Sequence, residues 1–120
     1  MKSNNLILDK SFDFSLLIIE LYKLMIAQKE YVISRQLLRS STSIGANVRE
    51  ATAAQTKKDF IAKMSIASKE ARESEYWLML LEKSNIVDVD CLIELEKSKE
   101  LIKILTAIVK TAQTSLNKDI

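Results

Sequence analysis

Residues 34–55 carry hydrophobic and small side chains at the spacing of one face of an α-helix. In SRQLLRSSTSIGANVREATAAQ these positions recur at alternating separations of four and three residues, which forms one continuous stripe. The stripe consists of Leu37, Ser41, Ile44, Val48 and Ala51. The opposite side carries three arginines among small residues: Arg35, Arg39, Arg49, Thr42, Ala46 and Ala53. We therefore predict a helix with one side in a core and the other side cationic.

The same spacing predicts three more helices, at about residues 11–28, 57–84 and 89–116. The third helix has the most regular row: Phe60, Met64, Ala67, Ala71, Ser74, Leu78 and Leu81. The fourth carries Cys91, Leu95, Ser98, Ile102, Leu105, Val109, Ala112 and Leu116. Short connections force neighbouring helices to run antiparallel. The prediction is an all-α, up-down-up-down four-helix bundle that forms one domain over residues 1–120.

Capping residues mark some of the helix ends. Thr56 followed by Asp59 resembles a capping box, and Asn85 suits the left-handed position just past a helix end. Either of two aspartates can cap the start of the last helix: Asp88 or Asp90. The break after the first helix is poorly marked, so Ser34 is predicted as the N-cap of the second helix.

The first predicted helix is apolar on two sides. One row comprises Phe14, Leu17, Leu21 and Leu24, and a second row, roughly opposite, comprises Phe12, Leu16, Ile19 and Ile26. A second row also runs along residues 57–84, where a wide core arc is the simpler explanation for Trp77. In a small bundle, extra rows favour contact with another subunit. The candidate oligomer interface is Phe12, Ile19, Ile66, Trp77 and Leu80.

The composition supports the helical prediction, and the charged residues are distributed unevenly along the chain. The chain has no proline and one glycine, so the usual residues of β-turns are nearly missing. Residues 35–72 hold eight basic and three acidic side chains, a local charge of +5, and residues 73–100 hold three basic and eight acidic ones, a local charge of −5. The net charge is only +2. Such segregation indicates a solvated polar surface or complementary faces for a neighbour.

No residue pattern points to catalysis, a cofactor or a metal site. Histidine is absent, and the single cysteine, Cys91, lies on a core row where it is expected to act as a small hydrophobic residue. Carboxylate pairs such as Glu70 with Glu73 are common on helix surfaces. The longest apolar run, Leu16 to Ile19, is too short to span a membrane. We predict a non-enzymatic, soluble, cytoplasmic protein, and no pattern identifies a small-molecule substrate.

Basic residues form a row that continues from the second helix into the third. The candidate nucleic-acid contacts are Arg35, Arg39, Arg49, Lys57, Lys58 and Lys63. The first interpretation of such a row is a solvated surface, and the second is a surface that neutralises backbone phosphates without reading sequence. Aromatic residues nearby are limited to Tyr31 and Phe60, so base-specific recognition is poorly supported.

The middle of the second helix is unusually small and polar, with Ser40, Ser43, Gly45, Ala46 and Asn47. A glycine in a helix interior costs about 1 kcal/mol relative to alanine. Close approach of another helix backbone would offset that penalty.

Two segments resemble a known family. QLLRSSTSIGANVREA, residues 36–51, closely resembles the signature of the bacterial four-helix-bundle family encoded by intervening sequences in 23S rRNA genes. KKDFIAKMSIASKEARESEYWLMLLEKSNIV, residues 57–87, is similar to that family's third helix, including its Glu-x-x-Tyr-Trp-Leu element. On this pattern the signature polar positions, serving assembly or a ligand, are Arg39, Ser40, Ser43, Asn47 and Glu50.

The resemblance implies a bundle that assembles into a ring, typically a homopentamer. It also implies distant kinship with the accessory protein of diversity-generating retroelements, a basic bundle that binds nucleic acid and a reverse transcriptase. We therefore predict an oligomeric bundle that binds rRNA or another nucleic acid, RNA or DNA, through its basic face. The alternative is a protein–protein interaction scaffold without a nucleic-acid role, and salt-dependent RNA binding distinguishes the two.

Overall fold

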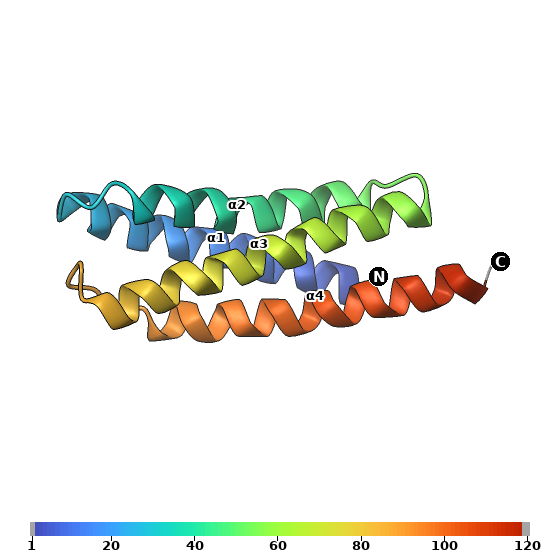
Figure 1. The fold of residues 1–120 in the computed structure, drawn as a ribbon. Helices are drawn as coiled ribbons and strands as arrows, with labels where there is room; N and C mark the ends of the chain where they lie inside the picture. Colours follow the sequence, from blue (N-terminus) through green and yellow to red (C-terminus); the bar gives the residue numbers. More distant parts are fainter. Residues whose placement is uncertain (1, 119–120) are drawn as a thin grey trace.

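The computed structural model describes residues 2–118, with side-chain environments from Leu6 onward. Four helices follow one another: α1 (Lys2–Ala27), α2 (Ile33–Thr52), α3 (Lys57–Ser84) and α4 (Leu92–Lys118). Each helix packs antiparallel against the next, and α4 returns to contact α1, which gives a rod with a long dimension of 53 Å (Figure 1). The predicted all-α, up-down-up-down bundle is confirmed.

The helix boundaries agree with prediction for α3 but differ elsewhere. The first helix begins at Lys2 and not near residue 11, α2 ends at Thr52, before the predicted residue 55, and α4 begins at Leu92, after the predicted residue 89. The first of these predictions was wrong because the core row of α1 starts with Ile7, one turn before the predicted helix. The helix α1 is thus longer because its apolar residues begin before the predicted start at residue 11.

The core row of α1 is also shifted relative to the predicted one. The buried residues are Ile7, Ser11, Phe14, Ile18, Leu21 and Met25, which follow a strict four-three rhythm. The predicted row was wrong at two positions, since Leu24 is 56% exposed and Leu17 is only half-buried. In a helix with apolar residues on two sides, several rows satisfy the 3.6-residue period, and only tertiary packing selects one.

The core rows of α2 and α3 are as predicted. Every member of the α2 stripe is buried, and Ile44 and Val48 have no exposed surface. On α3 the six residues from Met64 to Leu81 in the predicted row are buried, while Phe60 is half-buried against them. In α4 the buried positions are Ser98, Leu101 and Leu105.

Buried serines lie at the contact between α2 and α3. The hydroxyls of Ser40 and Ser74 form a hydrogen bond of 2.8 Å between α2 and α3. The hydroxyl that accepts in this bond donates its own proton to a carbonyl of its helix, that of Leu37 for Ser40 or that of Glu70 for Ser74. Over the residues the structure describes, no buried side-chain nitrogen or oxygen lacks a partner. Small hydroxyl residues therefore shorten the distance between helices without leaving polar groups unsatisfied.

Three of the predicted caps are confirmed. The Thr56 side chain accepts a hydrogen bond from the Asp59 N–H at 3.0 Å, which begins α3. Asn85 ends the same helix in the left-handed conformation with φ 55°. Asp90 Oδ1 accepts from the Leu92 N–H at 3.1 Å, at the start of α4. These caps fix the two connections that flank α3.

The start of α2 uses a different residue from the one predicted. Ser34 lies inside the helix and donates to the Glu30 carbonyl, so its assignment as the N-cap was wrong. The Glu30 carboxylate instead accepts from the N–H groups of Val32, Ile33 and Ser34 at 3.0, 3.0 and 2.7 Å. Lys29, with φ 67°, turns the chain so that Glu30 can reach forward. One carboxylate thus satisfies three of the free N–H groups at this helix start.

Gly45 faces α1, as the expected close approach requires. A Cβ atom placed on Gly45 would lie 3.5 Å from the Ser11 carbonyl oxygen, which is an ordinary van der Waals distance. The helices are close here because Ser11 and Ser15 are small, and Ser15 Oγ donates to the Ser41 carbonyl across the contact at 3.4 Å. Alanine would therefore fit, so the close approach does not by itself require glycine.

We expect Glu30→Ala to lower the free energy of unfolding by about 1–3 kcal/mol, because three N–H groups lose a largely buried acceptor. Glu30→Gln keeps one acceptor oxygen and should lose less. Urea denaturation at fixed protein concentration measures both, with the exposed Glu96→Ala as the control. If the Glu30→Ala variant were as stable as the wild type, this carboxylate would not hold the turn.

We expect Gly45→Ala to raise the free energy of unfolding by up to about 1 kcal/mol, because alanine gains helix propensity and meets no clash. The shift in the urea midpoint at constant slope measures the change. Gly45→Leu provides the contrast, since a long side chain must displace α1. Destabilisation by alanine would mean that α1 and α2 approach more closely than described.

Candidate functional site

The central arginine of the predicted basic row is paired with two carboxylates of α3. Arg39 Nη1 lies 3.3 Å from both oxygens of Glu70, and Arg39 Nη2 donates to Glu73. Glu73 also accepts from Trp77 Nε1 at 2.9 Å. The hydrogen bond from Arg39, followed by that from Trp77, lowers the pKa of Glu73, and the Glu73 hydrogen bond raises the pKa of Arg39. The charge of Arg39 is therefore neutralised within the chain.

A second predicted contact, Lys63, is also paired. Its Nζ lies 2.9 Å from Glu50 Oε1, and this hydrogen bond raises the pKa of Lys63. Three signature positions, Arg39, Ser40 and Glu50, thus contact α3. The other two pair within α2, where Asn47 Nδ2 donates to the carbonyl and hydroxyl of Ser43 at 2.8 and 3.1 Å. All five signature polar positions therefore have partners inside the chain.

The remaining predicted cations are less constrained. Arg35, Arg49 and Lys58 are exposed and form no ion pair within residues 2–118. Lys57 Nζ donates to Ser115 Oγ on α4 at 2.9 Å. The row is therefore divided: two members are neutralised, and three keep their charge available to a ligand.

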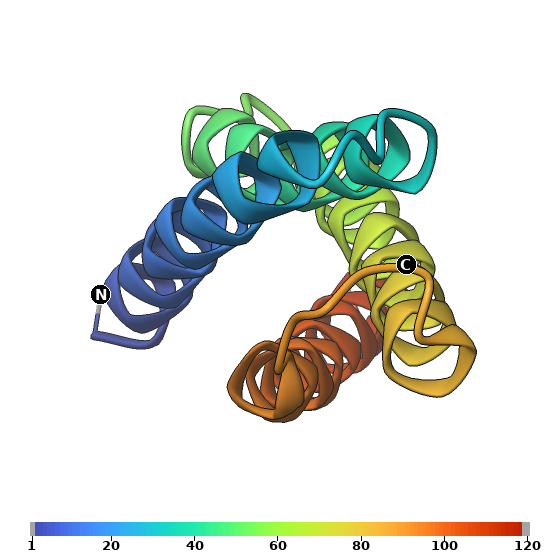
Figure 2. The same ribbon diagram turned by 90° about the vertical axis from the view of Figure 1, so that its left-hand side faces the viewer.

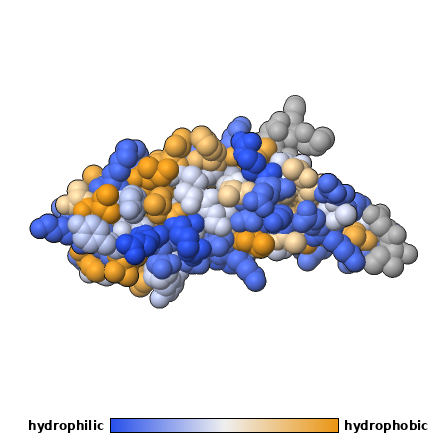
Figure 3. Space-filling model, turned by 90° about the horizontal axis from the view of Figure 1, so that it is seen from above, coloured by the Kyte–Doolittle hydropathy of each residue, from blue (hydrophilic) through white to orange (hydrophobic). Residues whose placement is uncertain are grey.

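The predicted interface residues lie on α1 and α3, the two helices that pack against α2. Phe12 is 59% exposed and Ile66 41% exposed, whereas Ile19, Trp77 and Leu80 are half-buried. Other large apolar side chains of α1 are also exposed: Leu6, Leu16 and Leu24. Figure 3 shows hydrophobic residues gathered toward the end where α1 joins α2. Whether a second copy covers them stays a prediction.

Phe12 and Arg49, assigned to different surfaces by the sequence, line one groove. This depression of about 210 Å³ between α1 and α2 also contains Gly45 and Ala46. Small residues form its base because larger side chains would fill the space between the two helices. An apolar ring beside an unpaired guanidinium suits a partner with both apolar and acidic groups.

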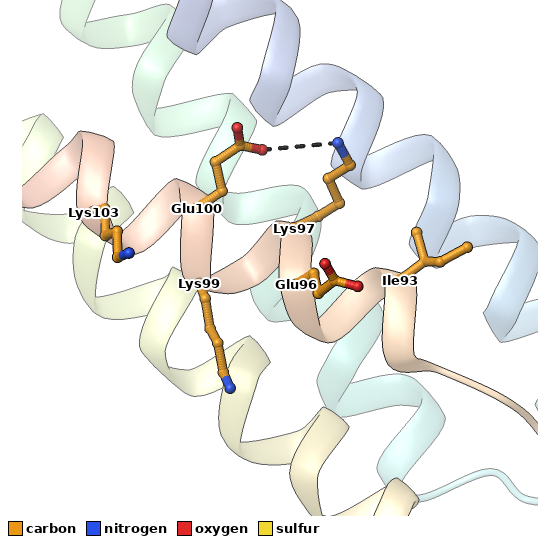
Figure 4. Close-up of a pocket in the computed structure, with 6 residues that line it drawn as sticks. All are labelled: Ile93, Glu96, Lys97, Lys99, Glu100 and Lys103. Atoms are coloured by element: carbon orange, nitrogen blue, oxygen red, sulfur yellow. Dashed lines mark ion pairs between the residues drawn. The ribbon is translucent and has the colours of Figure 1, made fainter.

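A larger depression on α4 was not anticipated. It measures about 630 Å³, and all its lining residues come from this helix: Ile93, Glu96, Lys97, Lys99, Glu100 and Lys103 (Figure 4). Lys97 lies 3.8 Å from Glu100, which also pairs with Lys10 of α1 at 3.0 Å. The hydrogen bond from Lys10 lowers the pKa of Glu100. Because the charges are mixed and partly paired, this surface has no strong preference for either sign.

Cys91 occupies the core and not a reactive site. Its Sγ lies 3.5 Å from the Leu78 carbonyl, and burial, with Glu82 as the next cause, raises its pKa to about 12. The thiol therefore stays protonated near neutral pH. Among the described residues, no three histidine, cysteine or acidic side chains are grouped to hold a metal ion. No helix in this part of the chain is long and apolar enough to cross a membrane.

Comparison with known proteins places this arrangement in a family. A protein of unknown function from the S23 ribosomal protein family of Bacteroides thetaiotaomicron VPI-5482, known from a crystal structure, is 47% identical. The match covers 90% of this chain and 98% of that one, with a TM-score of 0.84. None of the proteins with curated descriptions matches. The sequence profile of the 23S rRNA-intervening sequence proteins matches residues 3–107, which include the signature segment of α2 and all of α3. The chain belongs to the 23S rRNA-intervening sequence protein family.

Proposed function

We propose that this protein is a non-enzymatic, cytoplasmic helical bundle that self-associates and binds the backbone of rRNA or another nucleic acid. The observation that carries the proposal is the set of exposed cations without an ion pair in the described chain, Arg35, Arg49 and Lys58. Such cations release condensed counterions when they contact phosphates, which drives binding without base recognition.

Self-association would multiply the phosphate contacts that the few exposed cations of one chain can make. A ring, typically of five subunits as the family resemblance implies, would present the same cations several times. Repeated contacts with one nucleic acid raise the overall affinity through effective concentration. The exposed apolar residues of α1, among them Phe12 and Leu16, support assembly because their burial removes apolar surface from water.

The second candidate function is a protein-interaction scaffold without a nucleic-acid role. The groove between α1 and α2 favours it, since Phe12, Gly45 and Arg49 there suit a partner helix. The ion pairs of Arg39 and Lys63 favour it too, because they remove two cations from the predicted phosphate surface. Nucleic-acid binding that weakens with salt distinguishes the first function from the second.

We expect native mass spectrometry at micromolar concentration to detect an oligomer. A variant with Phe12→Ser and Leu16→Ser should dissociate into smaller species, because both residues are exposed on one chain. Val32→Ser, which changes a residue that is 74% exposed in the α1–α2 connection, is the control. A wild-type monomer would contradict assembly through α1.

We expect a variant with Arg35→Gln and Arg49→Gln to bind RNA more weakly and with less salt dependence. Two lost phosphate contacts reduce the slope of log affinity against log salt by about 1.4–1.8. Fluorescence anisotropy with a labelled RNA over a salt series measures the slope, after circular dichroism and mass analysis confirm fold and assembly.

The matched control replaces Lys23 and Lys97 by glutamine, because these lysines lie 2.9 and 3.8 Å from Glu20 and Glu100. It changes the net charge equally but removes cations that are already paired. Wild-type affinity that is the same at low and high salt would reject nucleic-acid binding and favour the scaffold.

A further inference from the structure

The antiparallel packing of α3 and α4 brings two basic segments of the sequence together. Residues 57–69 contain four lysines and one aspartate, and residues 103–118 contain three lysines and no acidic residue. The last turns of α4 lie beside the first turns of α3 (Figure 1), where Lys57 contacts Ser115. The acidic residues 73–100 lie toward the opposite end of this helix pair. The pair is therefore basic at one end and acidic at the other.

A groove between the two helices lies within the basic part. It measures about 250 Å³, and its polar lining consists of Ser65, Ser68, Arg72, Thr106, Lys110 and Gln113. Two of these side chains are cationic, four are neutral hydrogen-bonding groups, and no carboxylate lines the groove within the described residues. This composition differs from the mixed and paired charges of the depression on α4.

A second depression along α4 shares one lining residue with the groove. That depression, of about 400 Å³, shares Lys110 and adds Thr111, Thr114, Ser115 and Lys118. The rise of a helix places Lys118 about 12 Å from Lys110 along the axis. An elongated surface of cations and hydroxyls results, which is long enough for several phosphates and too open to enclose one ion. Lys110 lines both depressions.

Arg72 lies over the groove with its charge uncompensated. Its Nη2 donates to Thr106 Oγ1 at 3.3 Å, and it forms no ion pair with any described residue. Arg39, by contrast, is paired with Glu70 and Glu73. A guanidinium oriented by a neutral hydroxyl keeps most of its N–H groups and its full charge for an external anion.

The chemistry of this surface matches a phosphodiester backbone. Arginine, lysine, serine, threonine and glutamine side chains are the usual donors to phosphate oxygens. Among the described residues, no aromatic side chain lines either depression, so stacked bases would have no platform. Successive phosphates of one duplex strand advance about 3.4 Å along the axis, so the surface spans several of them. Binding here would be independent of sequence.

At the C-terminal end of α4, the α3–α4 pair lies away from α1 (Figure 2). Viewed along the bundle, the N-terminal end of α1 and the C-terminal end of α4 lie apart, so α1 does not cover the last turns of α4. A long polyanion can therefore lie along the α3–α4 pair without displacing another helix.

We propose that the groove between α3 and α4, centred on Arg72 and Lys110, binds the phosphodiester backbone of a nucleic acid. The inference rests on the proposed nucleic-acid binding and assigns it a contact surface that the arginines of α2 do not form.

The test compares two double variants with equal change in charge on the same two helices. Arg72→Gln with Lys110→Gln removes the cations of the groove, whereas Lys83→Gln with Lys99→Gln removes exposed lysines from the acidic part of the pair. A labelled RNA duplex of mixed sequence is titrated by anisotropy over a salt series. We expect the first variant to bind more weakly, with a salt slope reduced by about 1.4–1.8, and the second to resemble the wild type.

Arg72→Lys separates charge from structure, because it keeps the charge but loses the planar guanidinium. It should preserve the salt slope. Equal effects of the two double variants, with wild-type binding intact, would overturn the groove but leave the proposed function standing. Wild-type protein without salt-dependent RNA binding would overturn both.

Discussion

The register between α2 and α3 is the constraint on which the remaining surfaces depend. Ser40 of α2 contacts Ser74 of α3. Glu50, ten residues further along α2, contacts Lys63, which lies eleven residues before Ser74 in α3. One antiparallel alignment satisfies both contacts, and Arg39 with Glu70 and Glu73 satisfies the same alignment. Exposed ion pairs contribute little to stability, about 0–1 kcal/mol each. Together with the serine contact, these pairs select the register of α2 against α3. A shifted register would leave the Ser40 and Ser74 hydroxyls facing apolar neighbours.

This register also determines which charges remain available. It neutralises Arg39 and Lys63 inside the chain, so the predicted basic row on α2 is shorter than the sequence indicates. The Arg39 contact also uses Glu73 of the acidic segment 73–100, which weakens the idea that this segment faces the basic segment 35–72 of a neighbouring subunit. Uncompensated cations then concentrate on α3 and α4, where the partner of Arg72 among the described residues is the Thr106 hydroxyl.

Much of the fold could be predicted from the sequence, because the rows on α2 and α3 follow one helical period and Thr56 and Asn85 are typical caps. The row on α1 could not, since Leu17 and Ile18 both continue a helical stripe from Phe14. Glu30 escaped notice because a glutamate that reaches forward to three N–H groups is not a common capping pattern. The candidate sites were harder still. Pairing Arg39 with Glu70, or placing Ser65 near Lys110, requires the register between helices, which periodicity within one helix does not contain.

Assembly through α1 and binding at the α3–α4 groove are compatible in this geometry. The helices contact in the order α1–α2–α3–α4 and back to α1, so α1 and α3 occupy opposite corners of the bundle. Burial of the exposed residues of α1, such as Phe12 and Leu16, would leave the side of α3 that faces α4 open. Each subunit added through α1 would then add another cationic groove to the same particle. Since backbone binding strengthens with every phosphate neutralised, an oligomer would bind a long nucleic acid far more tightly than one chain could.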